Sequence, residues 1–273
     1  MVFRDEEGRF YHIGVKEGEL SHLVLLPGSR KRVKRIGELL EGAEVLHDGR
    51  FLVIKGKYKG RVVTALDTGI GPSSAAIVVR EVIEAIKYPE SGVATLIRPG
   101  TCGSLQPYVK VGDLVVTRGC IAQEGVSKRI VGEGFPLLAD PEVVMALVRA
   151  AEKNGYELGR NLHVGIHHVK DALYEVEDAS LAARPEEAAE NLRYLRRMGV
   201  LCTEMEFSIL SALAARYNAE WRASGVKRRV RVGGVFLVVS PVKEEMEEVE
   251  FTKVSQEGLI RTALDALVML EGE

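Results

Sequence analysis

The segment RPGTCGSLQ at residues 98–106 follows an apolar run, GVATLI at residues 92–97, and the rest of the chain is organised around it. A short apolar run bounded by turn residues is typical of a buried strand, so we expect a strand at 92–97 and one tight turn after it. The two glycines of the turn allow positive φ angles and close backbone approach, so that N–H groups point at an anion. Arg98 supplies a fork-shaped cation suited to phosphate, and Thr101 supplies a hydroxyl donor. The pattern predicts a phosphate-binding turn; the alternative is an ordinary glycine turn with Arg98 in a surface ion pair.

Apolar runs and amphipathic segments alternate along the whole chain. Further strands are expected at residues 21–26, 45–54, 58–66, 112–116, 162–168 and 233–239, with a turn at 55–57 (KGK) joining the second and third of these. Helices are expected at residues 33–40, 75–86, 140–153 and 256–270. Residues 175–197 are charged and are expected to be helical or partly mobile, like a lid, and residues 199–206 open an alanine-rich helix that ends near residue 217. This alternation is typical of the α/β class, and no repeat or linker divides it. We therefore expect one domain spanning residues 1–273.

Composition excludes several classes of function. The 273 residues carry a net charge of -2, with 37 Lys+Arg against 39 Asp+Glu and no basic stripe, so a nucleic-acid partner is not expected. Cys102, Cys120 and Cys202 form no CxxC pair, which indicates neither a disulfide framework nor a zinc site and is typical of a reducing cytoplasm. The six histidines show no metal-ligand spacing, and no apolar stretch has the length of a signal peptide or a membrane span. We expect a cytoplasmic protein with no metal and no membrane partner.

Other charged residues stand where strands give way to turns or helices. Gly28 and Arg32 lie between a predicted strand and helix, which is a natural anion site. Taken singly, Arg32 and Arg50 are more simply explained as solvated charges. Glu204 and Glu206 flank a methionine at a helix start, where they either complement the helix dipole or face a cleft and hold sugar hydroxyls.

Taken together and in order, these segments resemble the nucleoside phosphorylase family, whose members include uridine phosphorylase and hexameric purine nucleoside phosphorylase. The matching pieces are PG…R at 27–32, GRF at 49–51, TGIGPS at 68–73, R…GT…G at 98–103 and EME at 204–206. No single piece is decisive, but five in the right order and spacing are specific. The resemblance implies a three-layer α/β/α sandwich around a mixed, partly barrelled sheet.

The resemblance also implies the roles of individual residues. The implied phosphate site consists of Gly28, Arg32, Arg98 and Thr101, with Arg50 from a neighbouring subunit. The implied ribose site consists of Thr101, Glu204, Met205 and Glu206, with His12 of the neighbouring subunit at the 5′-hydroxyl. Arg98 and Glu206 are the implied catalytic residues. No metal or organic cofactor is implied, inorganic phosphate is a co-substrate, and sites are shared between subunits of a dimer-based homo-oligomer, commonly a hexamer.

The base end departs from the family pattern. Purine enzymes of the family place an aspartate directly after the serine that corresponds to Ser240, whereas this chain has Pro241, which cannot donate a proton. Uridine enzymes of the enterobacterial type place a glutamine and an arginine in the segment after Tyr174, where this chain has Glu177 and Ala179. The positions expected near the base are Cys102, Gly103, Leu173, Glu177 and Pro241. Glu177, Arg184 and Lys170 are candidate substitutes for the missing groups; the alternative is that each is a solvated charge on a lid.

The leading hypothesis is phosphate-dependent cleavage of a pyrimidine ribonucleoside, with uridine and phosphate giving uracil and ribose 1-phosphate. Arg32, Arg50 and Arg98 favour phosphorolysis over the hydrolysis that related nucleosidases perform, since water needs no phosphate cradle. Two alternatives are a purine nucleoside phosphorylase with a different base-protonating group and a non-catalytic nucleoside-binding protein that keeps the fold.

Overall fold

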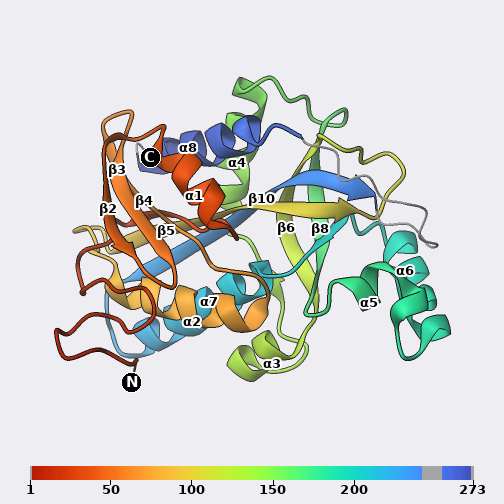
Figure 1. Cartoon of the computed structure of the whole chain (residues 1–273), viewed down its shortest axis with the longest axis horizontal. Helices are drawn as coiled ribbons and strands as arrows, with labels where there is room; N and C mark the ends of the chain where they lie inside the picture. The colour runs from red at the N-terminus through yellow and green to blue at the C-terminus, as the bar shows by residue number, and fades with distance from the viewer. Residues whose placement is uncertain (1, 242–253, 272–273) are drawn as a thin grey trace.

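A 10-stranded mixed sheet forms the centre of the molecule, whose computed structural model describes residues 2–241 and 254–271 (Figure 1). The strands are β1 (Leu23–Leu25), β2 (Glu41–Asp48), β3 (Leu52–Tyr58), β4 (Arg61–Leu66), β5 (Val93–Ser104), β6 (Leu114–Gln123), β7 (Leu137–Leu138), β8 (Leu162–Lys170), β9 (Cys202–Glu204) and β10 (Arg229–Pro241). They pair in the order β10-β6-β8-β9-β5-β1-β4-β3-β2, with β7 beside β6. Because β10 also pairs with β5, the strands β10, β6, β8, β9 and β5 close into a barrel, and the other strands extend from β5.

Helices cover both faces of the sheet. They are α1 (Arg30–Gly37), α2 (Pro72–Ala85), α3 (Gly125–Val131), α4 (Pro141–Lys153), α5 (Tyr174–Glu177), a 3₁₀ turn (Ala179–Leu181), α6 (Pro185–Arg197), α7 (Phe207–Ala223) and α8 (Glu257–Glu271). In Figure 1, α1, α4 and α8 lie on one side of the sheet and α2 and α7 on the other, while α5 and α6 stand beside β8. No helix in the described ranges is long and apolar enough to span a bilayer.

A hydrophobic core lies on each face of the sheet, and the side chains of β1 contribute to both. Leu23 and Leu25 pack into the core shared with α1, α4 and α8, whereas Val24 packs into the core shared with α2 and α7. Successive side chains of a strand point to opposite faces, so a fully apolar strand is expected wherever both faces are covered. The predicted α/β/α sandwich around a partly barrelled sheet is confirmed.

The segment at residues 98–106 differs from the prediction. It forms no tight turn, because β5 continues through it to Ser104 in parallel register with β10, and neither Gly100 nor Gly103 has a positive φ. The backbone groups of the segment therefore serve the sheet. Gly100 is needed for a different reason: a Cβ there would lie 2.6 Å from the ring of Phe236. The strand delivers Arg98 and Thr101 by running alongside the site.

The hairpin between β3 and β4 also differs from the prediction. The expected turn at 55–57 lies inside β3, and the chain reverses instead at Lys59 and Gly60, with φ values of 49° and 79°. Two consecutive positive φ angles match the twist of a two-residue hairpin, and lysine is an unusual residue at the first of them. Gly56, taken as a turn residue, instead allows close packing, since its Cβ would lie 2.8 Å from the Cβ of Leu40.

Some helix boundaries agree with the prediction and others differ from it. The helix expected at residues 140–153 is confirmed as α4, which has Asp140 at the N-cap and Pro141 as its first residue. The residue before α2 is Gly71, and Ser74 donates to the carbonyl of Thr68 at 2.6 Å. The charged segment at 175–197 is broken into α5, a 3₁₀ turn and α6, and α7 continues past Tyr217 to Ala223. The elements α3, β7 and β9 were not predicted, and the strand expected at 45–54 is divided between β2 and β3.

Candidate active site

A cavity of about 300 Å³ lies between the loops after β1 and β4, the carboxyl halves of β5 and β10, the end of β8 and the junction of β9 with α7. Its lining residues are Gly28, Ser29, Arg32, Gly69, Ile70, Arg98, Thr101, Cys102, Gly103, Lys170, Leu173, Glu177, Thr203, Glu204, Met205, Glu206, Val239 and Ser240. This set contains every predicted site residue except His12, Arg50 and Pro241.

Arg98 is a buried cation of the cavity with four side-chain and backbone partners. Its Nε donates to Oε2 of Glu204 at 2.8 Å, and its Nη2 donates to Oε2 of Glu206. Nη1 lies 3.4 Å from Oγ1 of Thr68 and 3.5 Å from the carbonyl oxygen of Leu26. Burial alone lowers the pKa of Arg98, but the carboxylates of Glu206 and Glu204 outweigh it and raise that pKa. The guanidinium, only 3% exposed, therefore stays charged.

Glu204 is surrounded by donors of the protein itself. Besides Arg98, it accepts from the backbone N–H groups of Glu206 at 3.0 Å and Phe207 at 2.8 Å, and His167 Nε2 lies 3.3 Å away. Burial raises the pKa of Glu204, but the charge of Arg98 and the hydrogen bond of His167 outweigh burial and hold that pKa far below its usual range. This carboxylate joins β9 to the start of α7 and fixes the orientation of Arg98.

Glu206 and Arg32 have spare capacity for a ligand. Oε1 of Glu206 accepts the N–H of Gly71 at 2.6 Å, and burial raises the pKa of Glu206 against the opposing charge of Arg98. Arg32 donates to the carbonyl of Pro99 at 3.1 Å, and burial followed by the charge of Arg98 lowers its pKa to about 10. A cation destabilised by a neighbouring cation gains from a bound anion. The corner between the two arginines is suited to phosphate.

Different chemistry lines the far end of the cavity. Lys170 Nζ pairs with Oε1 of Glu177, and Leu173 and Val239 contribute apolar side chains. Burial raises the pKa of the Cys102 thiol well above its usual value, so this cysteine is not an activated nucleophile.

The sheet order explains how these residues are spaced. β1, β5, β9 and β8 are successive neighbours, so the loop after β1 and the end of β8 are separated by three strand spacings, roughly 14 Å. The arginines lie on the β1 and β5 side, the two glutamates lie at the end of β9, and the Lys170–Glu177 pair lies at the end of β8. The arrangement has an anion-binding end, a carboxylate centre and a third polar end.

Three predicted residues lie outside the cavity lining. His12 Nδ1 lies 2.6 Å from Oε1 of Glu81, and Arg50 is exposed in the turn between β2 and β3. Pro241 is exposed at the end of β10, where Val239 and Ser240 line the cavity instead. Arg184, a candidate substitute at the base end, is exposed on the surface before α6.

Comparisons with known proteins agree with this geometry. The model of the family described as the phosphorylase superfamily matches residues 22–253. The chain is 37% identical to uridine phosphorylase of Thermococcus kodakarensis over 78% of this chain and 74% of that one, and 36% identical to guanosine phosphorylase of Halorubrum lacusprofundi over 70% and 81%. The crystal structure of uridine phosphorylase from Vibrio fischeri complexed with 6-hydroxy-1-naphthoic acid superposes with a TM-score of 0.76 at 25% identity, covering 98% of both chains. The chain belongs to the phosphorylase superfamily.

As a nucleoside phosphorylase, this protein is a pentosyltransferase, and several residues that shape its cavity had no signal in the sequence. Gln256 accepts from Nε of Arg32 at 2.9 Å across 224 residues of chain, and His167 had no predicted role, being one of six histidines without metal-ligand spacing. Thr68 and Gly71, which contact Arg98 and Glu206, belong to the TGIGPS segment but were assigned no role. Within the described residues, no group of three or more histidine, cysteine, aspartate or glutamate side chains is arranged to hold a metal ion.

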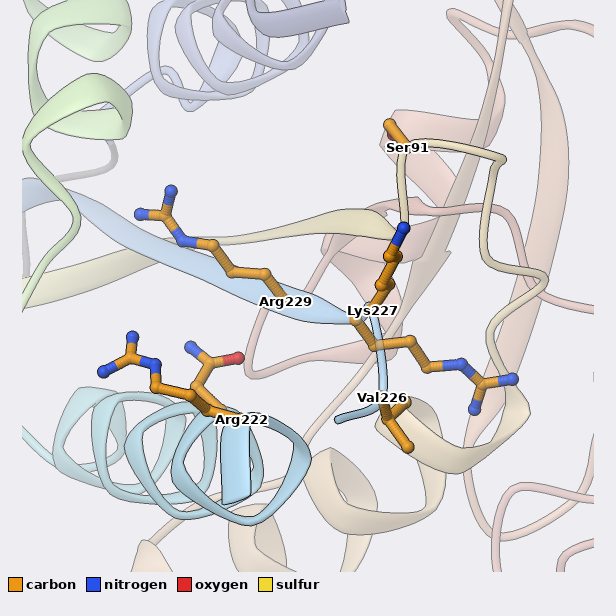
Figure 2. Close-up of a pocket in the computed structure, with 7 residues that line it drawn as sticks. Ser91, Arg222, Val226, Lys227 and Arg229 are labelled. Atoms are coloured by element: carbon orange, nitrogen blue, oxygen red, sulfur yellow. The ribbon is translucent and has the colours of Figure 1, made fainter. Parts of the chain in front are cut away.

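The phosphorylase has a second basic cavity, of about 440 Å³, near the end of α7 and the start of β10 (Figure 2). It is lined by Ser91, Asn218, Arg222, Val226, Lys227, Arg228 and Arg229. In Figure 2 the side chains of Arg222 and Arg229 extend to the same side, whereas Lys227 extends towards Ser91. The four cations are exposed, and no carboxylate lines the cavity among the described residues.

Proposed function

We propose that this nucleoside phosphorylase cleaves uridine with inorganic phosphate to give uracil and ribose 1-phosphate. One observation carries the proposal: Arg32 and Arg98 meet Glu206 in a single cavity, so that an anion site adjoins a carboxylate suited to ribose hydroxyls. The uridine phosphorylases among its relatives, including that of Treponema pallidum at 30% identity over 95% of this chain and 93% of that one, support uridine as the substrate.

In the proposed reaction a phosphate oxygen bonds to C1′ of ribose while the bond from C1′ to the base nitrogen breaks. The bonding pair leaves with the base, so the sugar becomes cationic in the transition state. Arg32 and Arg98 hold the phosphate and orient its attacking oxygen, and the carboxylate of Glu206 favours the positive sugar. Gly28 lines the cavity beside this cation.

The remaining lining residues divide between ribose and support. We assign Thr101 and Met205 to contacts with phosphate and ribose, since both line the cavity beside the arginines and Glu206. Glu204 is assigned to positioning, because Arg98, two backbone N–H groups and His167 all contact its two oxygens, whereas each oxygen of Glu206 has one protein donor among the described residues. No cofactor is required in this scheme. The free cysteines are consistent with the proposal that the enzyme acts in nucleoside salvage in the cytoplasm.

Charge balance supports a site shared between subunits. The cations that line the cavity are Arg32, Arg98 and Lys170, and its carboxylates are Glu177, Glu204 and Glu206. A phosphate dianion adds two negative charges to this balanced set, so another cation favours its binding. We propose that Arg50 and His12 of a neighbouring subunit complete each site in a dimer-based hexamer. Ile70 lines the cavity and is 77% exposed. A large apolar side chain this exposed supports the proposal that a neighbouring subunit covers the surface beside the cavity.

A mixing experiment tests the shared site. Arg50→Ala and Glu206→Ala variants, each inactive alone, are expected to regain part of the activity after subunit exchange, because one site in a mixed dimer is then intact. Exchange is followed independently with two differently tagged chains. Complete exchange without any recovery would place each site within one chain.

A second candidate function is purine nucleoside phosphorolysis. The guanosine phosphorylase relative and a DeoD-type purine nucleoside phosphorylase of Caldanaerobacter subterraneus, 35% identical over 77% of this chain and 83% of that one, favour it. Pro241 opposes it, because the backbone and side chain of proline offer no proton to a purine ring.

Parallel assays distinguish the candidates. Base release from uridine, thymidine, inosine and adenosine is measured with and without phosphate, in buffer containing a metal chelator. Release from uridine that depends on phosphate is expected. Release from a purine nucleoside alone would support the second candidate, and saturable binding without turnover would identify a non-catalytic nucleoside-binding protein.

A further inference from the structure

Lys170 has an uncommon position for a lysine. Its side chain is 1% exposed, which makes it one of the largest fully buried side chains of the described chain. It ends β8, and its Nζ pairs with Glu177 of α5 and lies 3.2 Å from Oγ1 of Thr203. A buried ammonium is costly unless it is paired, so this position is expected to be either a structural ion pair or a ligand site.

A chain of hydrogen bonds fixes where the ammonium points. Lys170 only donates, so the hydroxyl of Thr203 accepts from it, and that hydroxyl lies 3.0 Å from Nδ1 of His168. Burial, with the charge of Lys170 next in size, lowers the pKa of His168 to about 3, so the imidazole is neutral and adds no second positive charge beside the ammonium. Thr203 and Glu177 together hold Lys170 at the wall of the cavity.

The pair has unused hydrogen-bonding capacity on the cavity side. An ammonium has three N–H donors, and the side-chain partners of Lys170 within the described residues are Glu177 and Thr203. Oε1 of Glu177 faces Lys170, and Oε2 has no protein donor among the described residues. One donor beside one acceptor is complementary to a ring N–H beside a carbonyl.

We propose that Lys170 and Glu177 bind the base and select nucleosides whose base carries a ring N–H next to a carbonyl. This inference rests on the proposed function, because it assigns the third end of the same cavity. Glu177 accepts the ring N–H and Lys170 donates to the carbonyl oxygen. Uracil, thymine, hypoxanthine and guanine present that edge. Cytosine and adenine present an amino group beside a bare ring nitrogen, which sets a lone pair against the carboxylate and an N–H against the ammonium.

The same contact stabilises the departing base. When the bond between C1′ and the base nitrogen breaks, the electron pair spreads from that nitrogen to the carbonyl oxygens. The ammonium of Lys170 lies at the carbonyl where negative charge develops, and the base takes its proton from water on release. Lys170 is therefore a catalytic residue for a reaction in which no aspartate follows Ser240.

The test uses the full-length enzyme with Lys170→Met and Glu177→Gln, and with Glu175→Gln as the matched control. Glu175 lies in the same short helix, is exposed and does not line the cavity. Lys170→Met is expected to lower kcat for uridine about 100-fold or more, the effect of removing one donor to a developing negative charge, while the KM for phosphate stays unchanged. Glu177→Gln is expected to improve cytidine relative to uridine at least about tenfold, because an amide donates as well as accepts. Glu175→Gln is expected to match wild type.

A leaving-group comparison separates catalysis from structure. The base of 5-fluorouridine carries negative charge more readily than uracil, so Lys170→Met is expected to lose less activity with it than with uridine. Equal losses with both nucleosides would indicate a structural ion pair and overturn the inference. Wild-type turnover of cytidine or adenosine as efficient as that of uridine or inosine would overturn it too. If wild type released no base from any nucleoside with phosphate, the proposed function itself would fail, which is a different outcome.

Discussion

Two arginines of this phosphorylase are each held by two carboxylates, in opposite surroundings. Arg98 lies in the active-site cavity between the glutamates of the β9–α7 junction and is 3% exposed. Arg229 lies in the second basic cavity, pairs with Asp140 at 2.5 Å and Glu142 at 2.7 Å, and has a side chain that is 48% exposed. Both arginines pair with two carboxylates, and they differ in how much of the side chain is exposed to solvent.

The difference shows why a cluster of cations does not identify a site. Water and salt screen the ion pairs of Arg229, so these pairs contribute little to stability. For the same reason, the exposed cations of this cavity are not expected to bind an anion strongly. Around Arg98, which is 3% exposed, the carboxylates, a threonine hydroxyl and a backbone carbonyl converge; burial strengthens these charge interactions and the contacts hold the group in one orientation. Preorganised charge of this kind stabilises a transition state, because it needs no rearrangement during reaction.

The largest effect on activity is expected when Arg98 and Arg229 are each replaced by methionine in separate variants. Arg98→Met removes the cation that holds phosphate, so kcat/KM is expected to fall about 1000-fold or more. Arg229→Met is expected to keep kcat/KM within about twofold, as is usual for surface changes away from a site. Phosphate-dependent base release from both variants, assayed well below their unfolding temperatures, is the measurement. A similar loss in both variants, or none in Arg98→Met, would remove the distinction between the cavities.

A smaller effect is expected on stability when one buried carboxylate is neutralised. Glu204→Gln leaves Arg98 with one charged partner, so the free energy of unfolding at pH 7 is expected to fall by about 3 kcal/mol. Because the pKa of Glu204 is held below its unfolded value, its contribution is full above about pH 5 and is lost as pH falls towards the folded pKa. In denaturant titrations of wild type and variant, the difference in the free energy of unfolding should therefore become smaller from pH 7 to about pH 3. Parallel curves would mean that the charge of Glu204 does not stabilise the fold.

The sequence predicted the parts of the fold and site that depend on short segments of the chain. The strands β1, β4 and β8, the helix after Asp140 and the convergence of Arg32, Arg98 and Glu206 follow from apolar patterns and from motif resemblance. The structure of residues 98–106 was predicted incorrectly, because the partner strand β10 lies more than a hundred residues later and turns an apparent glycine turn into a continued strand.

Contacts distant in sequence explain the rest. Gln256 bonds to Arg32 from the start of the last helix, and no local pattern relates the two. Lys170 and Glu177 were predicted only as candidates, since a charged residue before a lid is usually solvated. Burial of Lys170 depends on how α5 folds back beside β8, which is a tertiary feature. His167 contacts Glu204 because β8 and β9 are neighbouring strands of the barrel.

The smallest effect is expected from Arg229→Met on stability. Its pairs with Asp140 and Glu142 are partly exposed, so the free energy of unfolding is expected to fall by less than about 1 kcal/mol at low salt. Asp140 keeps its other contact, accepting the N–H of Val232 at 2.8 Å, so α4 stays anchored to β10. The difference from wild type in urea titrations should vanish at about 1 M NaCl, where charges a few ångströms apart are screened. A salt-independent loss of several kcal/mol would show that Arg229 behaves like Arg98, and that exposure does not separate the two cavities.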